Sequence, residues 1–173
     1  MRQAPVSWAS RPREGVYEEL EHPADLFLLI SGSDLPTLFE NALFALYDQM
    51  VVLSGFEARR EIVIDAREAS LAEALRALLV EALYRFAVDG FVAVGAEVDV
   101  DLETAAAGND TAGSGSGADA ATADVGVSAR LRGEDADKRR HTLLTEIKAV
   151  TFHRLSAAQA PDGTWRATVL LDI

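Results

Sequence analysis

The feature that most constrains the fold is a long segment, residues 92–103, in which apolar and acidic residues alternate. Apolar side chains occupy every second position, and acidic ones separate them over the second half. Because successive side chains of a strand point to opposite faces, this pattern predicts a strand with one face against a core and the other in water. Sheets of that kind are typically antiparallel. The apolar positions are Val92, Val94, Ala96, Val98, Val100 and Leu102.

The composition changes abruptly after this strand. Residues 104–124 consist mainly of Ala, Gly, Ser, Asp and Thr, with Gly and Ser alternating over 113–117. A phosphate-binding glycine loop needs a helix directly after it, and the residues that follow show no amphipathic pattern. We therefore interpret residues 104–124 as a flexible insert. Alternation resumes from Val125 to Leu131, which predicts that the two strands pair as a long hairpin across the insert.

Two amphipathic helices are predicted outside this hairpin. Apolar residues spaced three and four apart predict a helix over 35–50, with Ser33 or Asp34 as its N-cap. Ser70 and Glu73 form a capping box that opens the second helix. Further strands are predicted at 26–30, 60–65, 147–155 and 164–173, the last two joined by a turn at 161–163.

About six strands and two good helices predict an α+β protein, a two-layer sandwich in which the helices pack on a largely antiparallel or mixed sheet. The length of 173 residues fits one domain, placed at 16–173 with the insert inside it. Residues 1–15 are predicted to be a flexible N-terminal lead-in. They lack the apolar stretch of a secretory signal, and no apolar run could span a bilayer, so we expect a cytoplasmic protein, with a monomer favoured.

Charge narrows the classes of partner. The chain has 28 acidic and 16 basic residues, a net charge of −12. Direct binding to RNA or DNA needs a basic surface, and so does docking on an anionic membrane, so we expect neither. The absence of cysteine excludes disulfides, thiolate metal sites and cysteine nucleophiles.

Carboxylates beside apolar strands are candidates for chemistry. Asp25 directly precedes the strand at 26–30, and Asp172 follows the last apolar run. Ile173 is the last residue of the sequence, so its α-carboxylate lies next to Asp172. If the first and last strands meet, these oxygens form a site for a hard cation such as calcium or magnesium. Otherwise, Asp25 is a cap at the entry of its strand and Asp172 a solvated residue at the chain end.

Other candidates are more isolated along the chain. His22, His141 and His153 come from three distant segments and either converge on a metal or serve separately as structural hydrogen-bonding groups. Glu134 lies in a charged stretch that is either solvated or functional. Lys148 lies within a predicted strand and either faces solvent or pairs with a carboxylate across the sheet.

Several blocks, in the right order, resemble the archease family. The resemblance covers about Val16 to Ile173 apart from the insert. Pro23 stands where the family usually has Thr, and Phe152 where it has Tyr. The matching blocks are Tyr17-x-x-Leu20-x-His22-Pro23-Ala24-Asp25, Gly32 with the helix start Leu35–Phe39–Glu40, Gly133-Glu134 with His141, Ile147-Lys148-Ala149-Val150-Thr151-Phe152-His153, and Leu171-Asp172-Ile173.

The resemblance implies a small protein that assists the RtcB-type RNA-splicing ligase and is not itself an enzyme. It implies that the protein promotes guanylylation of the ligase by GTP and restores the ligase for multiple turnover, in tRNA splicing and RNA repair. The family's metal site carries over onto Asp25, Asp172 and Ile173, with calcium expected first and magnesium or manganese as alternatives. Neighbouring residues that we expect to support the site are His22, Glu134 and Lys148.

Two rival functions are considered beside this one. The first is a stand-alone metal-dependent hydrolase that uses His22, His141 and His153 with Asp25. The second is a chaperone-like adaptor that needs no metal. For the ligase activator, the acidic surface would complement a basic RNA-binding partner and speed their encounter.

Overall fold

The computed structural model describes residues 7–103 and 124–173. Within them lie two α-helices, eight β-strands and two short 3-10 helices. The helices are α1 (Leu35–Met50) and α2 (Leu71–Asp89), and the 3-10 helices are η1 (Trp8–Ser10) and η2 (Leu53–Gly55). The strands are β1 (Tyr17–Leu20), β2 (Leu26–Gly32), β3 (Arg60–Glu68), β4 (Phe91–Glu103), β5 (Asp124–Asp135), β6 (Ala149–Val150), β7 (Ser156–Gln159) and β8 (Trp165–Asp172).

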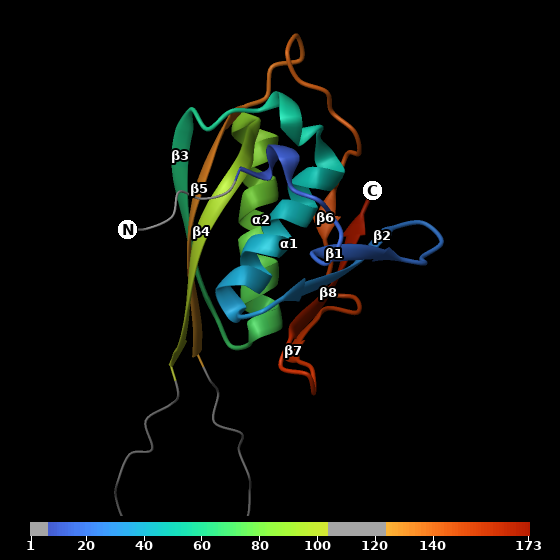
Figure 1. The fold of residues 1–173 in the computed structure, drawn as a ribbon, viewed down its shortest axis with the longest axis vertical. Helices are drawn as coiled ribbons and strands as arrows, with labels where there is room; N and C mark the ends of the chain where they lie inside the picture. The colour runs from blue at the N-terminus through green and yellow to red at the C-terminus, as the bar shows by residue number, and fades with distance from the viewer. Residues whose placement is uncertain (1–6, 104–123) are drawn as a thin grey trace, which may run out of the picture.

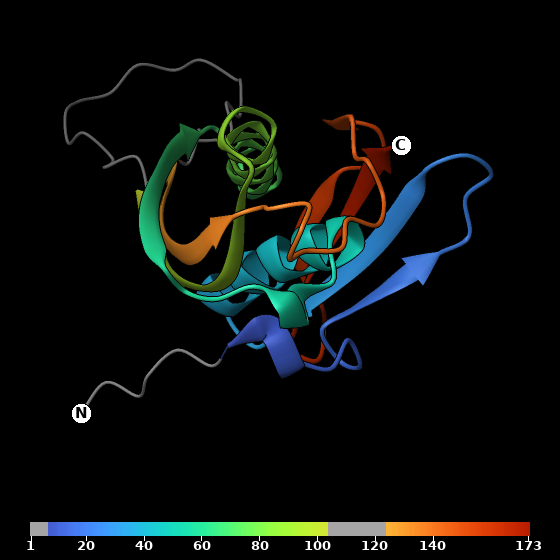
Figure 2. The ribbon, with the colours of Figure 1, turned by 90° about the horizontal axis from the view of Figure 1, so that it is seen from above.

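The strands form two antiparallel sheets with the two helices packed between them (Figures 1 and 2). One sheet has the order β1-β2-β8-β6, with β7 also beside β8, and the other has the order β3-β5-β4. The predicted α+β class and its two helices are confirmed. The strands divide into two sheets, and β1 and β7, too short to give a periodic pattern, add to the six strands that the sequence indicates.

Both helices begin at the side chains that the sequence indicates. The Asp34 carboxylate accepts the N–H of Thr37 at 2.8 Å, and the Ser70 hydroxyl accepts the N–H of Glu73 at 3.2 Å. Gly90 ends α2 in the left-handed conformation, at φ 74°, where a side chain would be strained. Neither helix, nor any other in the described ranges, is long and apolar enough to cross a membrane.

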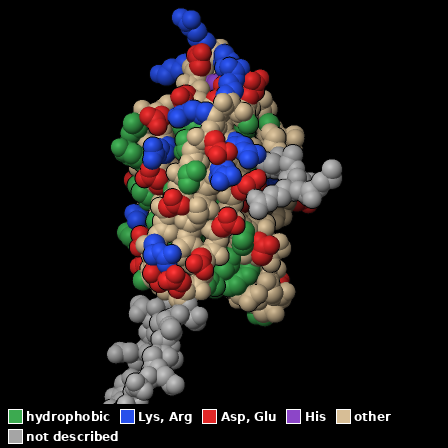
Figure 3. Space-filling view, turned by 90° about the vertical axis from the view of Figure 1, so that its left-hand side faces the viewer, with side chains coloured by type: hydrophobic (Ala, Val, Ile, Leu, Met, Phe, Trp, Pro, Cys, Tyr) green, Lys and Arg blue, Asp and Glu red, His purple; other side chains and the backbone are tan. Residues whose placement is uncertain are grey.

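The predicted hairpin is confirmed, since β4 and β5 pair from Phe91 opposite Asp135 to Glu103 opposite Asp124. Residues 104–123, nearly all of the predicted insert, lie outside the described residues. The first six residues of β4 are all buried, and alternation begins only beyond them. The outer face of this sheet carries acidic and basic side chains side by side (Figure 3), as expected for a face in water.

The lead-in predicted at residues 1–15 is wrong for its second half. Residues 1–6 lie outside the described part, but Trp8 is 1% exposed and belongs to the core. Its indole N–H donates to the Glu40 carboxylate at 3.2 Å, and a guanidinium N–H of Arg11 donates to Asn41. A single Trp in an Arg- and Pro-rich segment gives no periodic signal, although burying such a large apolar ring strongly stabilises the segment.

The strand predicted at 147–155 is also wrong. Within this stretch only Ala149 and Val150 form a strand, β6, which lies opposite Asp172 and Leu171 of β8. The chain then turns, with Arg154 at a φ of 52°, and returns to β8 as β7. The apolar residues in this stretch pack against the helices as well as the sheet, so their spacing resembles a strand without being one.

Two tyrosines give a matched test of the packing around α1. The Tyr47 hydroxyl is buried and has no hydrogen-bond partner among the described residues. The Tyr17 hydroxyl donates to Asp48 at 2.6 Å and accepts from Gln49 at 3.3 Å. We expect Tyr47→Phe to raise the free energy of unfolding by about 1 kcal/mol and Tyr17→Phe to lower it by about as much. Urea unfolding of both variants checks this, and equal losses would contradict it.

Candidate functional site

Strands β2 and β8, far apart in sequence, lie side by side in the five-stranded sheet. Leu26 lies opposite Leu171 at one end of their antiparallel pairing. Asp25 directly precedes Leu26 and Asp172 directly follows Leu171, so the two carboxylate residues lie at the same end of this strand pair. The condition stated from the sequence, that the first and last long strands meet, is therefore met. Both residues are partly exposed.

Lys148 lies at the same end of the sheet. Its backbone N–H donates to the carbonyl oxygen of Asp172 at 2.8 Å, which continues the pairing of β6 with β8 by one residue. Its ammonium group donates to a main-chain oxygen of Ile173 at 3.1 Å. Lys148 is exposed, as the first of its two alternatives states, and it also contacts the neighbouring strand, through a main-chain oxygen instead of a carboxylate side chain. Lys148 therefore holds the last two residues of the sequence in place.

His22 approaches the other carboxylate. Its Nδ1 atom lies 3.5 Å from a carboxylate oxygen of Asp25, and its ring meets Phe27 edge-on. That nitrogen is buried and has no hydrogen-bond partner among the described residues. An unpaired buried polar atom beside a carboxylate fits a site that receives a further polar group. The available ligands, two carboxylates and main-chain oxygens, are the set that hard cations prefer.

The three histidines do not come together. In the described ranges, no three His, Asp or Glu side chains lie close enough to hold a metal ion. His141 is buried against Phe56, His153 is exposed, and His22 faces Asp25. The hydrolase that would use His22, His141, His153 and Asp25 is therefore contradicted, because imidazole-bound catalytic zinc needs three converging ligands. Any cation site at Asp25 and Asp172 must draw further ligands from main-chain oxygens or water.

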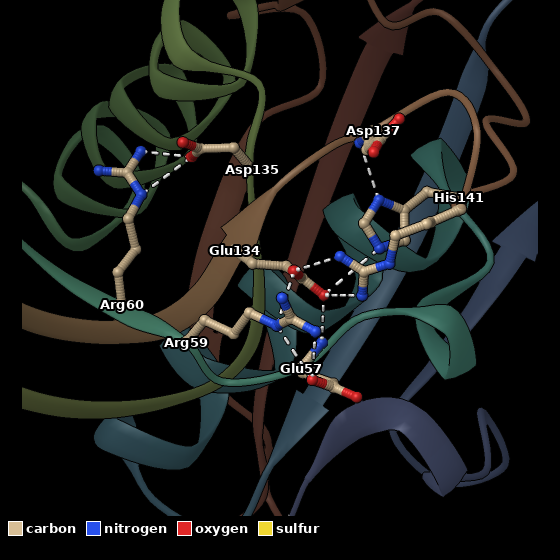
Figure 4. Close-up of polar contacts among 8 residues, drawn as sticks. Glu57, Arg59, Arg60, Glu134, Asp135, Asp137 and His141 are labelled. Atoms are coloured by element: carbon tan, nitrogen blue, oxygen red, sulfur yellow. Dashed lines mark hydrogen bonds and ion pairs between the residues drawn. The ribbon is translucent and has the colours of Figure 1, made fainter.

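Glu134 belongs to a different cluster, in β5 of the three-stranded sheet (Figure 4). It is 5% exposed, and its carboxylate accepts the N–H of Glu57 at 2.8 Å. A guanidinium nitrogen of Arg59 lies 3.2 Å from it, and Arg140 donates to it at 3.3 Å. Burial alone would raise the pKa of Glu134, but the Glu57 N–H and the two guanidinium groups hold it below its usual value. Glu134 does not join Asp25 and Asp172 in a metal-binding group.

His141 completes this cluster. The backbone N–H of Asp137 donates to its Nδ1 at 2.8 Å, so the proton of the neutral ring is on Nε2, which lies 3.3 Å from Glu134. The ring stacks on Phe56 with a centroid distance of 3.8 Å. Glu134 thus ties the end of β5 to the loop before β3 and to the segment that leads toward Lys148.

Sequence reasoning identified Glu134 and His141 but missed the partners that give them this role. Glu57 and Arg59 stand in a loop with no periodic pattern. Gly133 gives one signal that was available: a Cβ at this position would overlap the carbonyl oxygen of Val92. Only glycine therefore allows β4 to approach β5 this closely at the residue before Glu134.

Together, the fold and the two aspartates at one end of the β2–β8 pair define a small α+β protein with a candidate cation site at one end of a sheet. The model of the Archease protein family matches residues 17–173. The chain belongs to the archease family.

Curated relatives agree with this assignment. The protein archease of Methanosarcina acetivorans is 32% identical over 91% of this chain and 95% of its own length. That of Pyrococcus furiosus is 27% identical over 91% and 98%. The solution structure of Methanobacterium thermoautotrophicum protein 1598 matches with a TM-score of 0.66 and 23% identity over 91% of this chain and 98% of that one, which supports the fold alone.

Proposed function

We propose that this protein activates an RtcB-type RNA-splicing ligase. It promotes guanylylation of the ligase by GTP and restores the ligase for multiple turnover, in tRNA splicing and RNA repair. Membership of the archease family supports this role. In this function the protein is a cofactor of the ligase and performs no bond-forming chemistry itself.

The observation that carries the proposal is the meeting of Asp25 and Asp172 at one end of the β2–β8 pair. Carboxylates at the same end of two paired strands repel one another, and a cation that binds both relieves this repulsion. Lys148, which binds Ile173, places one fixed positive charge nearby, and the described residues offer no arginine or histidine ion pair to Asp172. The arrangement therefore favours a bound cation.

We propose that Asp25, Asp172 and Ile173, through its main-chain oxygens, hold this cation. Calcium is the cation that best fits these oxygen ligands, because it accepts irregular mixtures of carboxylate, carbonyl and water oxygens. Magnesium and manganese are the alternatives. A bound divalent cation supplies charge that neutralises phosphate oxygens. His22 lies beside Asp25, and Lys148 binds Ile173, the residue that follows Asp172.

A reconstituted reaction tests the proposal. Purified RtcB-type ligase is incubated with GTP and a nicked RNA substrate, with this protein either absent or present at a small fraction of the ligase concentration. We expect both the guanylylated fraction of the ligase and the number of ligation cycles per ligase to rise when the protein is added. A ligase whose guanylylation and turnover are the same in both reactions would contradict the proposed function.

The metal-independent adaptor is the remaining alternative. It predicts that stimulation survives when divalent cations are removed from the activator before mixing. The proposed site predicts that stimulation is lost and returns when calcium is added back. Because the ligase has its own metal requirement, the activator alone is treated with chelator and then desalted.

A further inference from the structure

The outer side of α2 carries an apolar stripe that nothing in the described chain covers. The inner side of the helix packs into the core through Leu75, Leu78 and Ala82. Tyr84 is nevertheless 56% exposed and Val88 61% exposed, on the opposite side. Together with Val80, these side chains are spaced four residues apart and so form one line along the helix. A contiguous exposed apolar line usually marks an interaction surface, unlike scattered apolar residues.

This stripe borders a groove of about 570 Å³ between α2 and residues 146–150. Figure 2 shows α2 facing the C-terminal strands, and the groove is lined by residues of both α2 and the segment 146–150. Its lining includes Val80 and Tyr84 from the helix, and Glu146, Lys148 and Val150 from the facing segment. The groove is thus apolar along the helix and reaches the residue that binds Ile173.

Arg76 gives the groove a positive charge. Its Nε donates to the carbonyl oxygen of Val150 at 2.9 Å, and its guanidinium lies 3.6 Å from the centre of the Phe152 ring. Within the described residues, its two terminal nitrogens have no hydrogen bond, and no carboxylate lies within ion-pair distance. Two parallel N–H donors of this kind match a carboxylate. In a protein with a net charge of −12, Arg76 therefore gives the groove a guanidinium that is free to pair with a carboxylate, whereas the Lys148 ammonium already contacts Ile173.

Phe152 extends the apolar surface beyond the groove. It is 64% exposed although it carries the Arg76 guanidinium on its ring. Aromatic and arginine side chains at the centre of a patch are the residues that contribute most to protein–protein binding. The surface therefore combines an apolar line, an aromatic ring and an unpaired guanidinium, at the end of the sheet where Lys148 holds Ile173.

We propose that this surface, formed by Arg76, Val80, Tyr84 and Phe152, is the docking site for an apolar segment of the ligase that carries a carboxylate. The inference rests on the proposed function, because it takes the ligase as the partner. Docking here brings the ligase against the segment that contains Lys148, and so beside Asp172. The carboxylate of the ligase segment pairs with Arg76 while its apolar side chains cover Tyr84 and Val80.

The test measures binding of the full-length protein to purified RtcB-type ligase by biolayer interferometry. We expect Tyr84→Glu and Arg76→Glu each to raise Kd by at least about 10-fold. The effect of Arg76→Glu should shrink as salt is raised, since a charge pair is lost. Val63→Glu is the matched control for Tyr84→Glu, because Val63 is also an exposed apolar residue, 50% exposed on the outer face of the other sheet, that is replaced by Glu. Its Kd should stay within about twofold of wild type.

Measuring stimulation of the ligase distinguishes a failure of the proposed docking surface from a failure of the proposed function. At concentrations that saturate binding, Tyr84→Glu should still stimulate, because Asp25 and Asp172 are unchanged. Wild-type affinity in both Tyr84→Glu and Arg76→Glu, with normal circular dichroism, would overturn the surface while leaving the function in place. A wild-type protein that neither binds nor stimulates the ligase would overturn both. Dimers that Tyr84→Glu converts to monomers, with unchanged ligase affinity, would overturn the surface in favour of a second copy of this chain.

Discussion

Replacing Asp172 with Asn is expected to weaken calcium binding by about 100-fold and to abolish stimulation of the ligase. The substitution keeps the size of the side chain and removes one of the two negative charges at the end of the β2–β8 pair. Calcium affinity depends on the number of charged ligands, so losing half of the side-chain charge has a large effect. Asp25→Asn should behave in the same way. Calorimetry with calcium and the reconstituted ligase reaction measure the two effects.

Asp99→Asn is the matched control for these variants. Asp99 is exposed in β4 and lies opposite Ser128 of β5, in the three-stranded sheet and not in the sheet of the β2–β8 pair. Its replacement by Asn removes one negative charge, as in the two test variants. It should keep wild-type calcium affinity and full stimulation. If Asp25→Asn and Asp172→Asn lose calcium but still stimulate, the adaptor without a metal is correct. If they keep both properties, the proposed cation site is wrong.

Replacing Glu134 with Gln is expected to lower the free energy of unfolding at neutral pH by about 3 kcal/mol. The carboxylate is buried and receives bonds from the Glu57 N–H and the Arg140 guanidinium. Gln keeps the shape but not the charge that these donors and Arg59 stabilise. Urea unfolding measures the loss. The control is Glu61→Gln. Glu61 pairs with two arginines on the solvent-exposed face of the sheet, and such exposed pairs contribute less than about 1 kcal/mol to the free energy of unfolding.

The same comparison gives a pH dependence. Because the pKa of Glu134 is lower in the folded protein than in the unfolded chain, its stabilising effect is complete above the unfolded value of about 4.3. This effect is lost as the pH falls through the folded value. The difference between wild type and Glu134→Gln should therefore be constant near neutrality and shrink below about pH 4. A difference that stays constant down to pH 2 would show that the charge of Glu134 is not what stabilises the fold.

Much of the fold could be predicted because its signals are local. The caps of α1 and α2 depend on side chains within three residues of each helix start, as with Asp34 and Thr37. The pairing of β4 with β5 follows from two consecutive alternating runs, one on each side of the insert. By contrast, the burial of Trp8 depends on contact with α1, more than 30 residues away, and no local sequence pattern indicates it.

The sequence by itself determined the class of fold, the two helices, the long hairpin and the identity of the candidate residues, since each depends on periodicity, capping or a short motif. Only the tertiary structure decided how those residues are grouped. Antiparallel pairing of β2 with β8 places Asp25 and Asp172 at the same end of one sheet, whereas Glu134, in the other sheet, is held by Glu57 and Arg59, and His141 by Asp137 and Phe56. The physical reason is that sheet register joins residues about 147 positions apart in the chain, and such distant pairing leaves no trace in local spacing.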